Sequence, residues 1–200
     1  MQIFDLHPET PQERWMQKIA DIFKAGGVVV YPTDSGYSVG CDANNIKAIQ
    51  KLYTLKKGIK KYVMALMFQD FSHISEYATV DNNAFRYMKA RTPGPYTFIL
   101  PSQVHIHRKL KVKRQEIGVR MPDHVFFKAL HPFFEGPILN TAAKVEDSDV
   151  LVSIDEIIAV FKNQVDCIVS FGDVPHIPTN IISLLGDEPE IIRGEDLLAG

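Results

Sequence analysis

The chain has 200 residues, of which 46% are hydrophobic and 23% are charged, and its formal net charge is −2. This composition is that of a globular protein, and the charge excludes a uniformly basic nucleic-acid-binding protein, so contact with RNA would require a local basic patch. With only two cysteines, Cys41 and Cys167, the sequence also excludes a disulfide framework. No basic leader precedes an apolar segment at the N-terminus, and no apolar run approaches the roughly 20 residues that cross a bilayer. We therefore expect a cytoplasmic protein with no membrane partner.

Helical and strand patterns alternate along the chain, which predicts one α/β domain over residues 1–200 with a mixed sheet. The first helix is expected to begin at a capping box formed by Thr10 and Glu13 and to end at the glycine pair at residues 26–27. Three valines at residues 28–30 then predict a buried strand. The ladder of this strand should stop at Pro32, because proline has no backbone donor.

The remaining elements follow from the same signals. Four further helices are expected, capped by Asn44 or Asn45, by Asp81, by Asp123, and by Ser153 in a second capping box with Glu156. Further strands are predicted at residues 63–68, 96–100, 117–121, 138–141, 166–171, 180–184 and 190–193, and a tight turn joins the last two. Apolar residues at helical spacing, Ile46 and Phe85 among them, are expected to face the core.

Polar residues collect at the ends of the predicted strands. The first strand leads into Thr33, Asp34 and Ser35, which suits a small polar ligand at a strand end, although an ordinary turn is the alternative. Comparable turns occur at residues 93–97, 118–122, 140–144, 178–182 and 191–194. Arg120 and Arg193 lie in two of these turns and suggest an anion clamp, because guanidinium groups match carboxylate and phosphate oxygens in pairs. A surface ion pair is the alternative for an isolated strand arginine such as Arg120.

Taken in this order, the segments resemble the YrdC/YciO family of threonylcarbamoyl-AMP synthase-like proteins. The resemblance rests on YPTDSGY at residues 31–37, PGPYT at residues 93–97 and RMPDH at residues 120–124, and it extends from the first helix to Arg193. The DSGY sequence and the TPG sequence at residues 92–94 are more similar to the YciO branch than to the characterised synthases. The family implies a twisted α/β fold, with helices flanking a mixed sheet around a large basic cavity.

The resemblance also implies an activity. Family synthases combine L-threonine, bicarbonate and ATP, with Mg²⁺, into threonylcarbamoyl-AMP and release pyrophosphate. A partner protein then transfers the carbamoyl group to adenosine 37 of certain tRNAs. Such a nucleotidyltransferase needs no protein nucleophile, because the carbamate of threonine attacks the α-phosphorus. The protein positions the substrates and stabilises charge.

Roles for individual residues are carried over from the family. The amino acid would be held by Thr33, Ser35, Arg120 and Thr179. The nucleotide would be held by Lys56, Thr141, Lys144, Thr179 and Arg193. Lys56 at the phosphates and Arg120 at the carboxylate or carbamate would act in catalysis.

The chain departs from the synthases at several of these turns. Thr54 stands where the synthases carry a basic residue. Their Thr-Ser-Ala-Asn turn loses a hydroxyl at Ala142 and an amide at Lys144, and their Pro-Ser-Thr-Val-Val-Asp run has Asn180 and Ser183 in place of the threonine and the acid. Each lost charge-assisted hydrogen bond removes ~1.5–3 kcal/mol. The alternative is therefore a YciO-type paralogue that binds nucleotide or double-stranded RNA without efficient synthase activity.

Basic residues and histidines supply the weaker candidates. A possible RNA-binding patch consists of Arg108, Lys109, Lys111, Lys113 and Arg114, and a charged edge strand or loop is the alternative. His105 and His107 would share one face of a strand but lack a third ligand, so no metal site is predicted. His124, which follows the clamp arginine, could line the cavity or cap a surface element.

Overall fold

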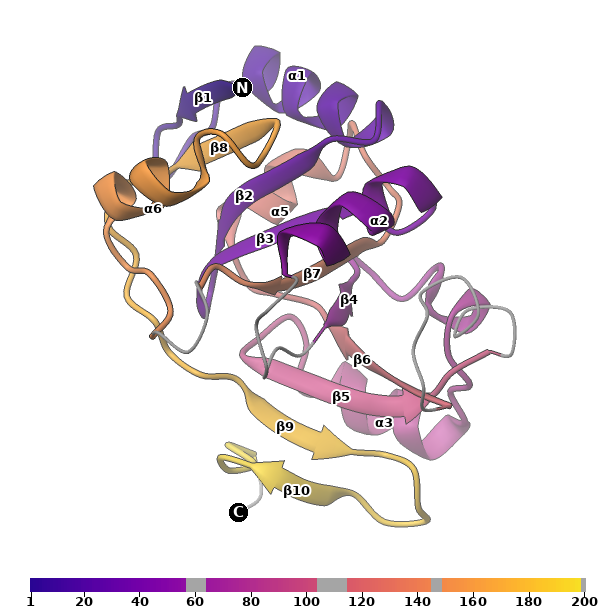
Figure 1. The fold of residues 1–200 in the computed structure, drawn as a ribbon. Coiled ribbons are helices and arrows are strands. Elements are labelled where there is room, and N and C mark those ends of the chain that lie inside the picture. The colour runs from indigo at the N-terminus through magenta and orange to yellow at the C-terminus, as the bar shows by residue number, and fades with distance from the viewer. Residues whose placement is uncertain (57–63, 104–114, 145–148, 199–200) are drawn as a thin grey trace.

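The strands of the described residues all join one sheet in the computed structural model, which describes residues 1–56, 64–103, 115–144 and 149–198 (Figure 1). The strands are β1 (Gln2–Asp5), β2 (Val28–Thr33), β3 (Gly36–Asp42), β4 (Ala65–Met67), β5 (Tyr96–Pro101), β6 (Glu116–Arg120), β7 (Ile138–Ala142), β8 (Cys167–Ser170), β9 (Asn180–Ser183) and β10 (Glu190–Arg193). Their order in the sheet is β1-β8-β2-β3-β7-β4-β6-β5-β9-β10. Parallel and antiparallel pairs both occur, which confirms the predicted mixed α/β fold.

Helices cover both faces of this sheet. They are α1 (Glu13–Lys24), α2 (Ile46–Leu55), α3 (Asn82–Lys89), α5 (Val125–Leu130) and α6 (Ile154–Phe161), with a 3-10 turn, η1 (Ile74–Glu76). Helices α1 and α5 contribute to one buried cluster and α2, α3 and α6 to the other. Strand β2 contributes side chains to both clusters, because successive side chains of a strand point to opposite faces. Val28 and Val30 pack in the cluster with α2, and Val29 and Tyr31 pack in the cluster with α1.

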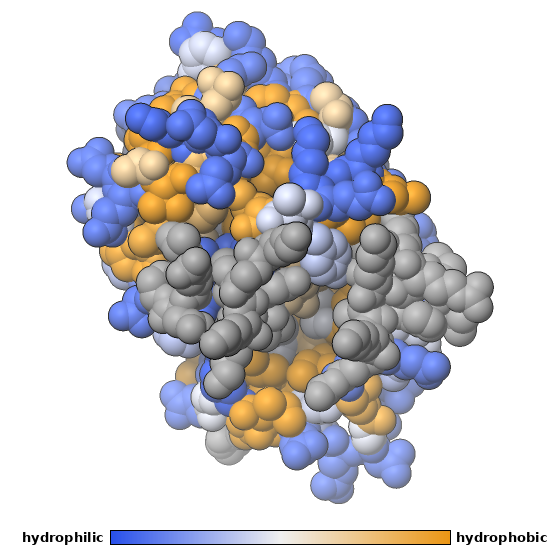
Figure 2. Space-filling model, in the orientation of Figure 1, coloured by the Kyte–Doolittle hydropathy of each residue, from blue (hydrophilic) through white to orange (hydrophobic). Residues whose placement is uncertain are grey.

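Only one face of each outer helix is buried. Figure 2 shows hydrophilic side chains along the outside of the upper helices and hydrophobic side chains between them, as expected for amphipathic helices. Two expected core residues are exposed. Ile46, the first residue of α2, is 56% exposed because Ala48, Ile49 and Leu52 form the buried face of that helix, and Phe85 is 38% exposed beside the buried face of α3, Ala84 and Met88. Cys41 and Cys167 are buried free thiols. Across the described ranges, no helix is both long enough and apolar enough to span a bilayer.

The predicted loop after Pro32 is instead part of a hairpin. Strand β2 pairs with β3 as far as Thr33 opposite Gly36, so only Asp34 and Ser35 form the turn. Gly36 has φ +113°, a conformation that L side chains rarely adopt. Proline is tolerated at Pro32 because the pairing of β2 with β8 has already ended at Val30.

Helix starts were predicted correctly where the cap is local. Asn45 accepts a hydrogen bond from the Ala48 amide, and Asp81 caps α3 in the same way. The capping box at Thr10 is wrong: α1 begins at Glu13, because the Thr10 hydroxyl contacts His7 Nδ1 at 3.1 Å instead.

Two other helix caps come from unexpected residues. Ser153 precedes α6 but makes no side-chain cap. Instead, the Ile154 amide donates at 3.0 Å to Asp173, which lies 19 residues after Ile154. Helix α5 is capped by His124 rather than Asp123, since His124 Nδ1 accepts from the Phe126 amide at 3.1 Å.

The cap at His124 makes the stability of the fold depend on pH. Burial lowers the pKa of this imidazole to about 4. Between the ordinary value of about 6.5 and pH 4 the unfolded chain binds the proton and the folded chain does not, so stability falls as the pH falls. We expect a loss of about 2–3 kcal/mol through this window. The free energy of unfolding should be measured in urea at pH 7 and pH 4.5.

Asparagine is the matched control at this cap. It accepts the same amide hydrogen bond without titrating, so His124→Asn should remove this part of the pH dependence while keeping the stability at pH 7. An unchanged pH dependence in His124→Asn would contradict the assignment.

Candidate functional site

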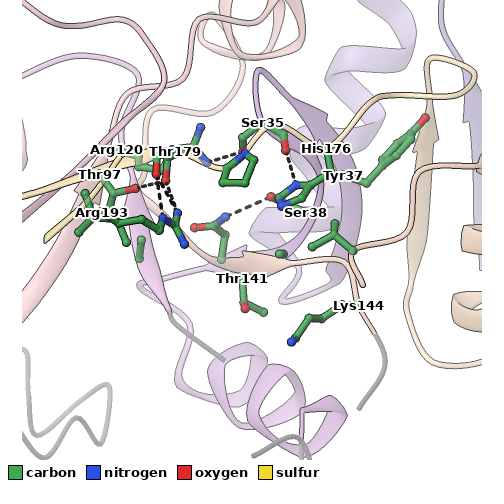
Figure 3. A pocket seen from close by; sticks show the side chains of 16 residues that line it. Ser35, Tyr37, Ser38, Thr97, Arg120, Thr141, Lys144, His176, Thr179 and Arg193 are labelled. Atoms are coloured by element: carbon green, nitrogen blue, oxygen red, sulfur yellow. Dashed lines mark hydrogen bonds between the residues drawn. The ribbon is translucent and has the colours of Figure 1, made fainter. Parts of the chain in front are cut away.

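A cavity of about 230 Å³ opens where the hairpin β2–β3, strands β5–β7 and the segment around β9 meet (Figure 3). The polar candidates that line it are Ser35, Arg120, Thr141, Lys144, Thr179 and Arg193. They come from five separate segments, which the order of the strands in the sheet brings together. The charged side chains of this lining are basic, Arg120, Lys144 and Arg193, which favours an anionic ligand.

Arg120 anchors one wall of the cavity. Its guanidinium forms an ion pair with Asp34 and donates a 2.9 Å hydrogen bond from Nη1 to Ser35 Oγ. The Asp123 amide donates to the other carboxylate oxygen of Asp34 at 3.0 Å. Burial raises the pKa of Asp34, while Arg120 and the Asp123 amide oppose the shift. Asp34 therefore serves to hold Arg120 in place at the turn.

A second cluster forms around Thr179. Its hydroxyl lies 3.0 Å from the hydroxyl of Thr97. Arg193 donates from Nη2 and Nε to the Thr179 carbonyl at 2.8 and 3.1 Å, and from Nη2 to the Thr179 hydroxyl at 3.2 Å (Figure 3). These contacts hold the guanidinium of Arg193 against the cavity wall. The strand that carries Arg193, β10 (Glu190–Arg193), is exposed.

Two buried polar atoms of the cavity residues lack hydrogen-bond partners among the described residues: Arg120 Nε and Asn140 Oδ1. Arg120 is 5% exposed and Asn140 is 4% exposed. The amide nitrogen of Asn140 donates to Ser38 Oγ at 3.3 Å, which orients the free oxygen. A buried donor or acceptor without a partner costs about 1–3 kcal/mol, so this pair favours a ligand that offers one acceptor and one donor.

His176 lies at the edge of the cavity and was not predicted as a site residue. Its Nδ1 lies 2.8 Å from the Ser35 carbonyl, so Nδ1 carries the proton. A side chain at Gly36 would lie 3.3 Å from His176 Cα, which explains how a glycine lets this segment approach the hairpin.

Other lining residues were also missed by the sequence analysis, namely Ser38, Thr97 and Asn140. In two cases the sequence carries a signal, because Thr97 and Asn140 fall in the polar turns at residues 93–97 and 140–144. Ser38 lay in what was interpreted as a loop.

Two predicted ligand contacts lie outside the cavity lining. The Thr33 hydroxyl is buried beneath the turn, where it donates to the Gly36 carbonyl at 2.7 Å and lies 3.0 Å from Ser35 Oγ. Lys56 Nζ donates to the carbonyls of Ala142 and Lys144, both at 3.0 Å. Burial, and secondarily the charge of Lys144, lowers the pKa of Lys56 to about 8. In this structure both residues support the cavity wall and do not reach its interior.

The residues that depart from the synthase pattern have structural partners. Ala142 offers its carbonyl to Lys56, and Lys144 lines the cavity. The side-chain oxygen of Asn180 accepts from the Glu195 amide at 3.0 Å, and Ser183 is buried in β9. Asn180 thus fixes the chain that follows Arg193.

Several predictions concern residues beyond this cavity. His124 is absent from the lining and caps α5, with its ring 5.2 Å from that of Phe171. The basic run at residues 108–114, His105 and His107 lie outside the described residues. Within the described ranges, no group of three or more histidine, cysteine or acidic side chains could hold a metal ion.

Comparison with known proteins gives a consistent result. Residues 21–194 match the Sua5/YciO/YrdC family model, whose description is "Telomere recombination". The uncharacterised protein YciO of Escherichia coli K12 is 38% identical over 194 residues, covering 96% of this chain and 94% of its own. An uncharacterised protein of Haemophilus influenzae is 36% identical over 195 residues, again covering 96% and 94%.

Solved structures share the fold. The crystal structure of E. coli YciO matches with a TM-score of 0.86 at 37% identity over 96% of this chain and 94% of that one. The structure of Pyrococcus abyssi Sua5 complexed with L-threonine matches with a TM-score of 0.87 at 22% identity, over 96% of this chain and 57% of that one. At that lower identity the likeness establishes the fold alone.

Proposed function

Because the chain belongs to the Sua5/YciO/YrdC family, we propose that its cavity binds L-threonine, bicarbonate and ATP and forms threonylcarbamoyl-AMP. The observation that carries this proposal is the pair of unpartnered buried atoms, Arg120 Nε and Asn140 Oδ1. An amino acid offers the matching group to each atom, because its carboxylate accepts from a guanidinium and its amino or hydroxyl group donates to an amide oxygen. The fold shared with P. abyssi Sua5, whose crystal structure contains L-threonine, supports the same reading.

The rest of the lining suits a nucleotide. Lys144 and Arg193 offer positive charge to phosphates, and the hydroxyls of Thr141 and Thr179 can donate to phosphate oxygens. Mg²⁺ would enter with the ATP phosphates, because it binds through substrate phosphates and waters more often than in an all-protein cage.

The reaction requires positioning and charge stabilisation. The amino group of threonine first combines with bicarbonate to give a carbamate, with loss of water. A carbamate oxygen then attacks the α-phosphorus of ATP, the bond from that phosphorus to the bridging oxygen breaks, and pyrophosphate leaves with the electron pair. Arg120 would hold the carboxylate during this attack, while Arg193 and Lys144 offset the charge on the phosphates.

The product would belong to the modification of tRNA adenosine 37, in which a transfer protein takes the carbamoyl group from the adenylate. That role places the protein in the cytoplasm, and tRNA and the transfer protein would then be its macromolecular partners.

Pyrophosphate release tests the proposal. We expect release from ATP and Mg²⁺ to require both L-threonine and bicarbonate, and we expect Asn140→Ala to weaken L-threonine binding by about tenfold in calorimetry, since the donor of the ligand loses its acceptor. Arg14→Ala, on α1 and outside the cavity, should leave both measurements unchanged. No binding of either substrate to the unmodified protein would reject the proposal.

The position of Lys56 favours a second candidate function. This lysine was expected at the phosphates, but its ammonium is engaged by two carbonyls of the cavity wall. A YciO-type protein that binds a nucleotide or double-stranded RNA without completing the synthesis would fit this arrangement. ATP binding without pyrophosphate release, with both co-substrates present, would select this candidate.

A further inference from the structure

Arg193 reaches the cavity from a strand that the core does not hold. All four residues of β10 are exposed, including Ile191 and Ile192, and among the described strands it pairs with β9 alone, at the edge of the sheet. Register is strongly specified where one face of a strand is buried and weakly specified where it is not. Something other than core packing must therefore fix the position of Arg193.

A bulge in β10 turns Arg193 toward the cavity. Ile191 lies opposite Ile182, but Arg193 lies opposite Ile181, so Ile192 is an extra residue. Ile182 belongs to the buried core and Ile181 lines the cavity, so these partners face opposite sides of the sheet. In regular pairing, Arg193 would share the face of Ile191 and point away from the cavity.

The chain just after the bulge is fastened to α3. Asp196 receives hydrogen bonds from Arg91 Nε at 2.7 Å, Arg91 Nη2 at 2.5 Å and the Tyr87 hydroxyl at 2.5 Å. The side chains of Arg91 and Asp196 are 11% and 6% exposed. The guanidinium of Arg91 also lies 3.6 Å from the centre of the Tyr87 ring, and the Leu197 amide donates to the Tyr96 hydroxyl at 2.9 Å. We call this cluster, Tyr87, Arg91, Tyr96, Asp196 and Leu197, the C-terminal latch.

We propose that Asp196, through the C-terminal latch, is a positioning residue that keeps β10 in its bulged register and so keeps Arg193 directed into the cavity. Two residues, Gly194 and Glu195, separate Arg193 from Asp196, and Gly194 has φ +77°. This short, bent connection transmits the position of Asp196 to the bulge. Arg91 lowers the pKa of Asp196 to about 2, so the ion pair persists at neutral pH.

The register can be measured without a ligand. In the unmodified protein we expect an Arg193 Nε–H resonance protected from solvent exchange by the Thr179 carbonyl, and contacts between Arg193 and Ile181 across the strands in NMR spectra. In Asp196→Ala the Nε–H should exchange about tenfold faster or more, and the cross-strand contacts should move from Ile181 to Asn180. Asp196→Asn, which keeps an acceptor for Tyr87, should show a smaller change.

The matched control is Asp187→Ala, an exposed carboxylate in the turn of the same hairpin, which should leave the resonance protected. Protection and Ile181 contacts that persist in Asp196→Ala would overturn the proposal, and would mean that the hydrogen bond from Glu195 to Asn180 suffices to hold the bulge.

Ligand binding provides the second readout, and this part rests on the proposed function. Asp196→Ala should weaken Mg-ATP binding by about tenfold, and in an Arg193→Ala background it should cause no further loss, because the latch acts only through Arg193. If the losses of Mg-ATP affinity in the two variants add up, the latch does not act through Arg193 alone, and this part of the proposal is overturned. If the unmodified protein binds no ATP, the proposed function fails while the NMR result still decides whether the latch sets the register.

Discussion

Replacing Arg120 with methionine is expected to lower the free energy of unfolding by about 3–5 kcal/mol and to abolish L-threonine binding. The destabilisation arises because Asp34, whose side chain is 12% exposed, would keep a buried carboxylate without its cationic partner. Ser35 would lose its hydrogen bond from the guanidinium as well. Urea unfolding measures the first effect and calorimetry with L-threonine the second.

The double variant Asp34→Asn/Arg120→Met separates the two effects. Asparagine keeps an oxygen for the Asp123 amide and carries no charge, so most of the lost stability should return. L-Threonine binding should stay absent, because the missing Arg120 guanidinium is the group that binds the carboxylate of L-threonine. A double variant that binds L-threonine would show that Arg120 only supports the turn.

Local signals in the sequence predicted the strands and some of the caps. The valine run at residues 28–30 forms the buried strand β2, and Asn45 and Asp81 cap their helices through bonds to residues three positions ahead. Thr10 failed as a cap because a competing acceptor, His7, stands three residues earlier. The β2–β3 hairpin was missed because polar and glycine residues in β3 resemble a loop, although β7 buries that strand from the other side.

The sequence predicted which residues line the cavity better than it predicted how their side chains are oriented. Motif positions indicated Ser35, Arg120, Thr179 and Arg193, all of which line it. Whether a side chain points inward depends on non-local pairing, which a single sequence does not show. Lys56 is the clear case, since its partners are carbonyls 86 and 88 residues away.

Truncation of Tyr31, the first residue of the motif at residues 31–37, is expected to cost about 3–5 kcal/mol as Tyr31→Ala. The side chain is fully buried, and its ring centre lies 5.4 Å from Phe126, 5.6 Å from Phe127 and 6.0 Å from Phe23. Among the described residues, its hydroxyl donates to the weak acceptor Sδ of Met67, at 3.7 Å. Urea unfolding of Tyr31→Ala and Tyr31→Phe compares the contribution of the whole side chain to stability with that of its hydroxyl alone.

Tyr31→Phe should stay within about 1 kcal/mol of the unmodified protein and should bind L-threonine with unchanged affinity, because the ring packs and the hydroxyl contributes little. A side chain at Gly40 would lie 2.7 Å from the same hydroxyl, so glycine at position 40 leaves the space that the Tyr31 side chain occupies. On this account the motif combines a core residue, Tyr31, with a turn residue that faces the cavity, Ser35. A loss of L-threonine binding in Tyr31→Phe, with stability intact, would instead place the hydroxyl within reach of the ligand.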